Sequence, residues 1–375
     1  MAAPGALDGI RVADLSRVLA GPLATMILGD LGADVIKIER PGTGDDTRAW
    51  GPPWSSGGDS AYHLSVNRNK RSIALDLKDP ADLEVARTIA LRSDVVIENF
   101  RPGVMARAGL DHETLARERP DLISCRIAGI GRGAVAGYDF LAQAMGGLMS
   151  ITGDPDGEPR KIGVALVDVM TGLHAAIGIL AALRHRDRTG EGQLVEVDLL
   201  STTLFALANQ ASNWLTAGVV AQRMGNRHPS IAPYETLHAA DGPFVIAVGN
   251  DEQFRVLCEL LDQPELADDE RFATNAGRVT NREELVRTLE AVLAHDDAAT
   301  WIERLSARGI PCGMVNRIDQ AFELARDVGL DAVASIAGVD TVANPLHLSR
   351  TPASYRLPPP AIGEHSEDVR AEVRG

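Results

Sequence analysis

Short β-rich runs alternate with helix patterns through the first 130 residues, and this alternation constrains the fold more than any other feature of the sequence. The runs are IRVADL, ADVIKIER, RSIALDL, DVVIENF and LISCRIAG, and helix patterns such as GPLATMILGDLG and PADLEVARTIALRS lie between them. This alternation predicts βαβ units with right-handed crossovers, and therefore a parallel sheet. The apolar runs in ADVIKI and DVVI are typical of strands that are buried on both faces.

The sequence changes character after about residue 217. DGPFVIAVGND predicts a hairpin strand after an Asp-Gly turn, and the acid-rich segments that follow it predict helices. We therefore expect an α/β fold with a large domain over 1–200, built on the parallel sheet, and a smaller α+β domain over 220–320. The last segment, 321–375, contains a proline-rich stretch and ends in a short helix pattern.

Composition excludes several classes of partner and site. The net charge of −15 disfavours nucleic acid and anionic membranes as partners. No apolar run is long enough to cross a membrane without glycine or charge interruptions, and the N-terminus lacks the pattern of a secretory signal. The three cysteines, Cys125, Cys258 and Cys312, form no CxxC pair, so we expect no disulfide framework, no zinc site and a reducing cytoplasm.

Cations and one aromatic residue follow the ends of three predicted strands. Arg40 follows ADVIKIE, Lys78 follows RSIALDL, and Asn99, Phe100 and Arg101 follow DVVIE. Ligands of open parallel sheets bind beyond the carboxyl ends of the strands. A single arginine is commonly a solvated surface residue, but the repeated position after strand ends favours a nucleotide ligand with phosphates.

Common catalytic and nucleotide-binding motifs are missing. The chain has no GxxxxGK[ST] phosphate loop, no GxSxG nucleophile elbow and no HExxH metal pair. GIGRGA, at residues 129–134, fits GxGxxG/A but follows the wrong strand for a dinucleotide fingerprint. Its glycines are better explained by a flexible active-site loop or an ordinary turn, so nicotinamide binding is not favoured.

Asp168 is the one charged residue in the otherwise apolar stretch GVALVDVMTGLHAAIGILAAL. Aspartate is a preferred N-cap residue, and a helix pattern begins just after Asp168, so capping alone would explain it. A functional interpretation is also open. A poorly hydrated carboxylate at a helix N-terminus would stay ionised through the helix dipole and could attack an activated acyl group to form a covalent intermediate.

Nearly the whole chain resembles the family III CoA-transferases, which share their fold with the α-methylacyl-CoA racemases. The resemblance is carried by LDGIRVADLSRVLAGPLATMILGDLGADVIKIERPGTGDDTR, NRNKRSIALDLK, DVVIENFRPG, GYDFLAQAMGGLMSITG, VALVDVMTGLHAAIGILAALRHRDRTGEGQLVEVDLL and IPCGMVN. It implies a Rossmann-like large domain to which the C-terminal segment returns. It also implies an interlocked homodimer whose active site lies between the domains.

The resemblance implies that Asp168 is the nucleophile, which forms an aspartyl anhydride and then an aspartyl-CoA thioester. It implies no metal, and coenzyme A or acyl-CoA and a carboxylic acid as the small-molecule substrates. The implied CoA contacts are Val18, Leu19, Arg40, Leu75, Asp76, Leu77, Lys78, Asn99, Phe100, Arg101, Arg107, Val135, Ala136, Gly137 and Tyr138. Leu19 stands where the formyl-CoA transferase has glutamine, which disfavours formyl and oxalyl substrates.

Two alternatives to CoA transfer remain open at this stage. Racemases have His before Asp in a GHD motif, whereas this chain has Tyr138 before Asp139. Tyrosine, with an ordinary pKa of about 10, is a poor general base at neutral pH. The second alternative is a silent acyl-CoA-binding protein.

The segment that begins at Gly225 resembles the branch of the family that handles succinyl-type dicarboxylates. In this interpretation Arg227, His228 and Tyr234 could bind the distal carboxylate of the substrate. The alternative is that these residues belong only to a loop between the domains.

Overall fold

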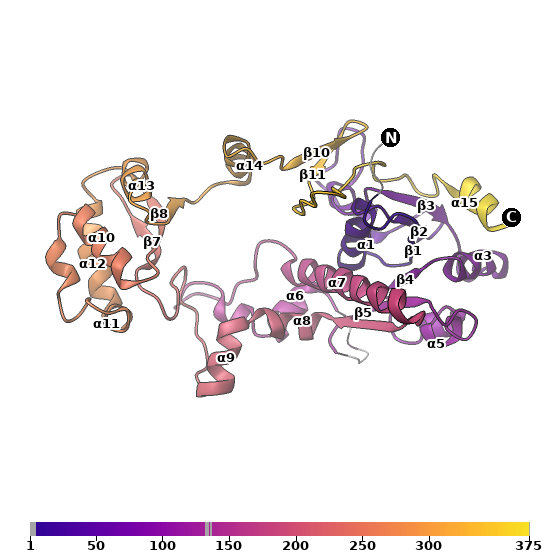
Figure 1. The fold of residues 1–375 in the computed structure, drawn as a ribbon, viewed down its shortest axis with the longest axis horizontal. Coiled ribbons are helices and arrows are strands. Elements are labelled where there is room, and N and C mark those ends of the chain that lie inside the picture. Colours follow the sequence, from indigo (N-terminus) through magenta and orange to yellow (C-terminus); the bar gives the residue numbers. More distant parts are fainter. Residues whose placement is uncertain (1–4, 132–134, 136, 375) are drawn as a thin grey trace. The chain divides into compact units, whose positions relative to one another are not determined.

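The computed structural model describes residues 5–131, 135 and 137–374 (Figure 1). The chain divides into two compact units. The first unit comprises Met1–Leu148, Lys161–Val219 and Gly329–Gly375, and the second comprises Met149–Arg160 and Val220–Val328. The chain therefore leaves the first unit twice and returns to it twice.

The first unit is built on a six-stranded parallel sheet, which confirms the α/β prediction. The strand order is β3-β2-β1-β4-β5-β6, the order of the Rossmann fold. The strands are β1 (Arg11–Asp14), β2 (Asp34–Glu39), β3 (Lys70–Ala74), β4 (Val95–Glu98), β5 (Ile123–Ala128) and β6 (Leu194–Asp198). The order reverses between β1 and β4, where Val12 lies opposite Val95, so a crevice opens beyond the carboxyl ends of these two strands.

Helices connect the strands of the first unit, and local signals define several of their ends. Asp79 caps α3 by accepting hydrogen bonds from the N–H groups of Ala81 and Asp82, and Pro80 occupies the first helical position. The helical segments are α1 (Ala20–Asp30), η1 (Asp46–Ala49), α2 (Ala61–Leu64), α3 (Pro80–Leu91), α4 (Val104–Ala108), α5 (His112–Leu115), α6 (Asp139–Met145), α7 (Leu166–Thr189), α8 (Leu199–Ala206), α9 (Ala208–Ala217) and α15 (Ser366–Arg374). The connection between β4 and β5 contains two short helices, α4 and α5, because Gly109 adopts a left-handed conformation after α4 and ends that helix.

Helix α7 packs against α1 and against the sheet, and this contact forms much of the core of the first unit. Gly172 makes the close approach possible, because a Cβ atom at this position would lie 2.6 Å from the carbonyl oxygen of Ala20. By length and composition alone, α7 is the one helix of the described residues that is apolar enough to span a membrane. In this structure its residues Ala175, Ile179 and Ala182 are buried in the core.

The second unit combines a small antiparallel sheet with a helical layer. The sheet has the order β7-β8-β9, and the hairpin between β7 and β8 turns at Asp241 and Gly242, as the sequence predicts. Its core includes the buried side chains Phe244, Phe254 and Phe272. Its elements are η2 (Met149–Ile151), β7 (Tyr234–His238), β8 (Pro243–Ala247), α10 (Asp251–Leu260), η3 (Pro264–Ala267), α11 (Asn275–Thr280), α12 (Arg282–Leu293), α13 (Ala298–Ala307), β9 (Cys312–Met314) and α14 (Ile318–Asp327).

The C-terminal segment binds to the first unit at the β3 edge of the sheet. It forms the hairpin β10 (Val333–Ile336) and β11 (Val339–Val342) and then an irregular stretch. The Arg356 guanidinium donates to the carbonyls of Gly29 and Ala33 at 2.9 and 3.0 Å. The yellow helix α15 lies beside β3 and α3 (Figure 1), so residues more than 270 positions apart pack together.

Candidate active site

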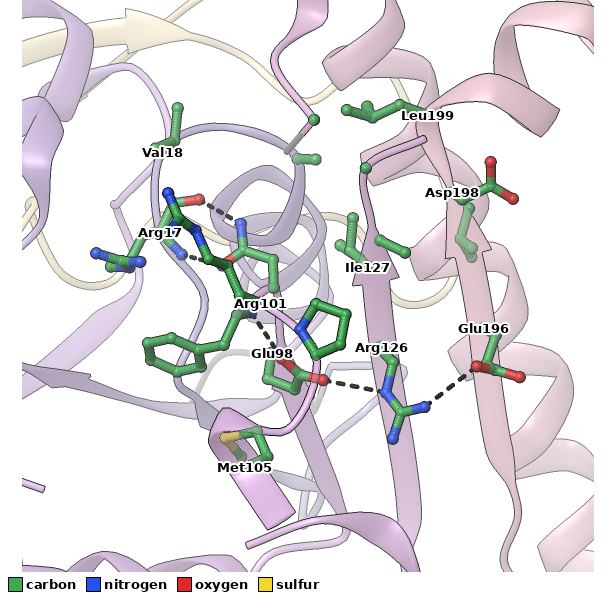
Figure 2. A pocket seen from close by; sticks show the side chains of 18 of the residues that line it. Arg17, Val18, Glu98, Arg101, Met105, Arg126, Ile127, Glu196, Asp198 and Leu199 are labelled. Atoms are coloured by element: carbon green, nitrogen blue, oxygen red, sulfur yellow. Dashed lines mark hydrogen bonds and ion pairs between the residues drawn. The ribbon is translucent and has the colours of Figure 1, made fainter. Parts of the chain in front are cut away.

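A cleft of about 660 Å³ opens in the first unit at the carboxyl ends of β1, β4, β5 and β6. Figure 2 shows its wall from close by, with Glu98 and Arg101 at the end of β4 and Arg126 and Ile127 on β5. Asp168, near the start of α7, also lines this cleft. The apolar part of the lining includes Met105 and Leu199.

Asp139, rather than Asp168, caps helix α7. The helix begins at Leu166, so Asp168 is its third residue, and the N-cap position is held by Ala165, which has no capping side chain. Asp139 Oδ1 accepts hydrogen bonds from the N–H groups of Val167 and Asp168 at 2.8 and 3.3 Å. The capping interpretation of Asp168 is therefore wrong, because a carboxylate from α6 supplies the acceptor that the helix terminus needs.

Asp168 lines the cleft, and its carboxylate accepts no hydrogen bond from the residues that the structure describes. Burial, together with the charge of nearby Asp139, raises the pKa of Asp168 to about 7. The sequence-based expectation that the helix dipole keeps this group fully ionised is therefore corrected. Near neutral pH both the protonated and the ionised form of the Asp168 carboxyl group are therefore populated.

Eight of the fifteen predicted CoA contacts line the same cleft as Asp168. They are Val18, Leu19, Asn99, Phe100, Arg101, Val135, Gly137 and Tyr138. Six others lie outside its lining: Arg40, Leu75, Asp76, Leu77, Lys78 and Arg107. Ala136 lies outside the described residues.

The sheet nevertheless brings three groups of the predicted contacts to one edge. Arg40 follows β2, the segment 75–78 follows β3 and Asn99 follows β4, and parallel strands end at the same edge. From β3 to β4 the edge spans three strand spacings, or roughly 14 Å, which suits an extended nucleotide. The Leu75 side chain is buried in the core, so only its main chain could contact a ligand.

Three arginines supply positive charge near this edge. The Arg17 guanidinium lies 3.1 Å from Asp46 Oδ2 and 5.1 Å from the centre of the Phe100 ring. Arg101 and Arg107 are exposed and pair with no carboxylate within the described part of the chain. Unpaired guanidinium groups are well suited to binding phosphates.

A row of charged side chains in the cleft was not anticipated from the sequence. Arg126 on β5 lies between Glu98 on β4 and Glu196 on β6, with nitrogen–oxygen distances of 3.3 Å to each (Figure 2). Burial raises the pKa of Glu98, although Phe100 N–H and Arg126 oppose this effect. The available signal was one arginine within the otherwise uncharged strand ISCRIA.

Gly129, in the GIGRGA segment, and Gly137, shortly after it, are both required by packing. A Cβ atom on Gly129 would lie 2.4 Å from the backbone nitrogen of Gly137, and one on Gly137 would lie 2.1 Å from the Cα of Gly129. The main chain therefore crosses itself closely beside the cleft, where any side chain would force the two segments apart.

The predicted substrate residues Arg227, His228 and Tyr234 lie together in the second unit. The rings of His228 and Tyr234 stack with centroids 5.1 Å apart. Arg227 pairs with Glu235 at 3.3 Å and also with Glu283. A ligand carboxylate at Arg227 would therefore compete with two protein carboxylates. Across the described ranges, no cluster of three or more His, Cys, Asp or Glu residues could hold a metal ion.

The fold and the cleft together define a class of enzyme. A Rossmann-type sheet offers a nucleotide-sized edge, and the cleft beside it contains Asp168, whose carboxylate accepts no hydrogen bond from the described residues. Residues 7–366 match the family described as CoA-transferase family III. The chain belongs to this family and is a CoA-transferase.

Relatives of known name agree with this assignment. The chain is 44% identical to a succinate–glutarate CoA-transferase of Agrobacterium fabrum, over 98% of this chain and 95% of the relative. It is 44% identical to a succinyl-CoA:glutarate CoA-transferase of Mus musculus, over 98% of this chain and 86% of the relative. A succinyl-CoA:mesaconate CoA-transferase of Haloarcula hispanica is 39% identical over 98% of this chain and 96% of its own.

Solved structures share the fold over the whole chain. A CaiB/BaiF family protein from Brucella suis aligns with a TM-score of 0.88 and 44% identity, covering 99% of this chain and 100% of the other. A hypothetical protein from Mycobacterium tuberculosis aligns with a TM-score of 0.89 and 32% identity, covering 98% and 100%. The parallel sheet and the small antiparallel sheets are thus features of the family.

The racemase alternative is not favoured. Both carboxylate oxygens of Asp139 are engaged, one by the N–H groups at the start of α7 and the other by Gln143 Nε2 at 2.6 Å. Tyr138 is 61% exposed. These hydrogen bonds stabilise the ionised form of Asp139 and tie it to the start of α7, which makes it a weaker base for removing an α-proton.

Proposed function

We propose that this enzyme moves CoA between carboxylic acids by covalent catalysis at Asp168. An Asp168 oxygen attacks the carbonyl carbon of the donor acyl-CoA, the carbon–sulfur bond breaks, and CoA thiolate leaves an acyl–Asp168 anhydride. The thiolate then attacks the Asp168 carbonyl carbon and releases the donor acid. The acceptor carboxylate attacks the carbonyl carbon of the resulting aspartyl-CoA thioester, the carbon–sulfur bond breaks, and CoA thiolate leaves a second anhydride between the acceptor and Asp168. The thiolate finally attacks the acceptor carbonyl carbon of this anhydride, which forms the new acyl-CoA and frees the Asp168 carboxylate. No bond energy from ATP is needed, since thioester and anhydride are both activated.

One observation carries this proposal. The Asp168 carboxylate lines the cleft and has no hydrogen-bond donor among the described residues, because Asp139 performs the capping role. A carboxylate that accepts no hydrogen bond from the protein keeps its lone pairs available for attack on an acyl carbon.

The acyl-CoA is proposed to bind along the carboxyl edge of the sheet. Val18, Leu19 and Tyr138 would flank the thioester beside Asp168, while Asn99 and Arg101 would meet the nucleotide part. Arg40, Arg107 and Lys78 lie beyond the cleft lining and would reach the phosphates, and the main chain of 75–77 would flank the base. Their positions at one sheet edge support this arrangement.

A succinyl-type dicarboxylate is the proposed substrate class. Three relatives of 39 to 44% identity bear names that combine succinate or succinyl-CoA with glutarate or mesaconate. A relative from Acetobacter aceti, 40% identical over 98% of this chain and 96% of its own, is named acetyl-CoA:oxalate CoA-transferase, so oxalate belongs among the acids to be tested. Arg227, His228 and Tyr234 are proposed to meet the distal carboxylate.

A second copy of the chain is proposed to complete the enzyme as a homodimer in the cytoplasm. Large apolar side chains are exposed on several helices, among them Ile177 on α7, Phe205 on α8, Trp214 on α9 and Ile318 on α14. Each is more than half exposed, and apolar surface of this kind commonly marks an interface. Sedimentation equilibrium at several concentrations tests the proposal, and a single species of 39.9 kDa would contradict it.

The decisive experiment compares Asp168→Asn with Asp187→Asn, the same change at an exposed position in the last turns of α7. Purified variants are given succinyl-, glutaryl-, acetyl- or oxalyl-CoA with dicarboxylic and branched acids, and the products are read by mass. We expect transfer to be lost only in Asp168→Asn. Hydroxylamine added during turnover should convert Asp168 to its hydroxamate, and an unmodified Asp168 peptide would contradict covalent catalysis.

A further inference from the structure

The backbone of Val18 is strained at the wall of the cleft. Residues 15–19 connect β1 to α1, and we name them the β1–α1 loop; Arg17, Val18 and Leu19 of this loop line the cleft that contains Asp168. Val18 has a φ of +72°. A left-handed backbone is rare for a β-branched residue, and it persists only where the surrounding structure enforces it.

A buried ion pair holds Val18 in this conformation. The Val18 N–H donates to both carboxylate oxygens of Asp45, each 3.2 Å away. Lys37 Nζ lies 3.0 Å from Asp45 Oδ2 and donates to the Ser16 carbonyl, also at 3.0 Å. Neither charged side chain is exposed to solvent. One ion pair thus fixes the main chain on both sides of Arg17.

Neighbouring side chains fix the rest of the loop. Asn99 Oδ1 accepts from the Arg17 N–H at 2.9 Å, and Asn99 Nδ2 donates to the Arg17 carbonyl at 2.7 Å. Asp14 Oδ1 accepts from the Ser16 N–H at 2.9 Å. The main chain of residues 16, 17 and 18 is therefore hydrogen-bonded at every position to a side chain from β1 or from another segment.

Charge keeps the ion pair intact. Burial opposes ionisation of Asp45, but Lys37 and the Thr47 hydrogen bonds outweigh it and hold the pKa of Asp45 well below its usual range. Burial likewise opposes the charge of Lys37, but Asp14, Asp45 and Glu39 outweigh it and raise the pKa of Lys37. Both groups are charged at the pH at which the enzyme would work.

The loop leads directly into the helix that packs against the start of α7. Ala20, the first residue of α1, touches α7 at Gly172, where a Cβ atom would lie 2.6 Å from the Ala20 carbonyl oxygen. Gly172 is one helical turn beyond Asp168. A change in the backbone at Val18 would thus move Leu19 and Ala20 relative to the Asp168 carboxylate.

We propose that Lys37 and Asp45 are positioning residues for CoA transfer: they hold Val18 in its left-handed conformation and thereby set the cleft wall opposite the reacting carboxylate. The inference rests on the proposed role of Asp168. Neither residue touches the cleft, since neither Lys37 nor Asp45 belongs to its lining. Their effect on the reaction must therefore pass through the β1–α1 loop.

A double-mutant cycle between Asp45→Asn and Val18→Gly tests this coupling. Glycine adopts a positive φ without strain, so the loop of a Val18→Gly variant no longer needs the ion pair. We expect Asp45→Asn to lower kcat at least tenfold in the wild-type background, with KM for acyl-CoA changed less than about threefold. In the Val18→Gly background the same change should lower kcat less than threefold, measured against Val18→Gly itself.

Equal losses of kcat in both backgrounds would overturn the proposal, because a general structural role of Asp45 does not depend on residue 18. A change confined to KM would overturn it too. Asp45→Asn removes the carboxylate that lies 3.0 Å from the buried Lys37 Nζ and could prevent folding. In that case the cycle is repeated with the double variant Lys37→Met, Asp45→Leu, which removes both charges. An unchanged kcat in this folded variant would equally contradict the proposal.

The cycle remains separable from the proposed function. If Asp168→Asn keeps full transfer activity, the nucleophile assignment fails whatever the cycle gives. If Asp168→Asn is inactive and the cycle shows no coupling, only the positioning role of Lys37 and Asp45 fails.

Discussion

Replacing Asp168 by asparagine should stabilise the free enzyme while it abolishes CoA transfer. Burial and Asp139 raise the pKa of Asp168 from 3.8 to about 7, so the folded state disfavours the ionised carboxylate. At about 1.36 kcal/mol per pH unit, this corresponds to a penalty of about 4 kcal/mol above pH 7. Because the side chain is partly exposed, roughly half of this value is a reasonable expectation. Asparagine is almost the same size and carries no charge.

The sign of the effect depends on pH in a defined way. A raised pKa means that the neutral carboxyl group contributes its full stability below about pH 4, and that this contribution is lost as the pH rises towards 7. The advantage of Asp168→Asn over wild type should therefore be near zero at pH 4, grow between pH 4 and 7, and stay constant above that. A gain of about 2 kcal/mol would raise the unfolding midpoint by roughly 4–8 °C in a domain of this size.

Thermal unfolding from pH 4 to 8.5, followed by circular dichroism, measures this difference. Asp187→Asn serves as the control, because it removes an exposed carboxylate from the same helix and should show no such pH dependence. A midpoint difference for Asp168→Asn that does not vary with pH, or a variant less stable than wild type at pH 8, would show that the ionised Asp168 carboxylate does not destabilise the folded enzyme.

Three further predictions follow from the same geometry. For wild type, kcat/KM should fall as the pH drops below about 7, because Asp168, the proposed nucleophile, is then protonated. Asp139→Asn removes a neighbouring negative charge and should shift this fall to lower pH. An unshifted pH–rate profile would contradict the electrostatic coupling between Asp139 and Asp168. Gly172→Ala should lower the free energy of unfolding, measured with denaturant, by about 1–3 kcal/mol, because the new Cβ atom would collide with the Ala20 carbonyl oxygen. A variant as stable as wild type would show that α1 and α7 can move apart without cost. Arg227→Gln should raise KM for a dicarboxylate acceptor at least fivefold more than for a monocarboxylate; equal changes would remove Arg227 from substrate binding.

Much of the first unit could be predicted from the sequence. The alternation of apolar runs and helix patterns reports burial and periodicity, both of which are local properties of the chain. It indicated strands close to their true limits, such as β2 (Asp34–Glu39) and β5 (Ile123–Ala128). The position of Asp168 in an apolar stretch marked it as unusual, and the segments after β2, β3 and β4 were correctly expected at one edge of a parallel sheet.

The cap of α7 and the pKa of Asp168 depend on contacts between residues that are far apart in the sequence. The capping acceptor of α7 comes from Asp139, 28 positions before Val167, and no spacing rule connects the two. The pKa of Asp168 follows from that same neighbour and from burial, so the sequence-based expectation of a fully ionised group was wrong.

Hydrophobic periodicity is a local property of the chain, so the amino-acid sequence was sufficient to predict the sheet, the alternation of strands with helices and the unusual position of Asp168 in an apolar stretch. The folded structure was needed to show that Asp168 accepts no hydrogen bond from the described residues, that burial and Asp139 raise its pKa to about 7, and that a buried Lys37–Asp45 pair holds Val18 in a strained conformation. These properties depend on electrostatic and steric interactions among groups that only folding brings within a few ångströms of each other.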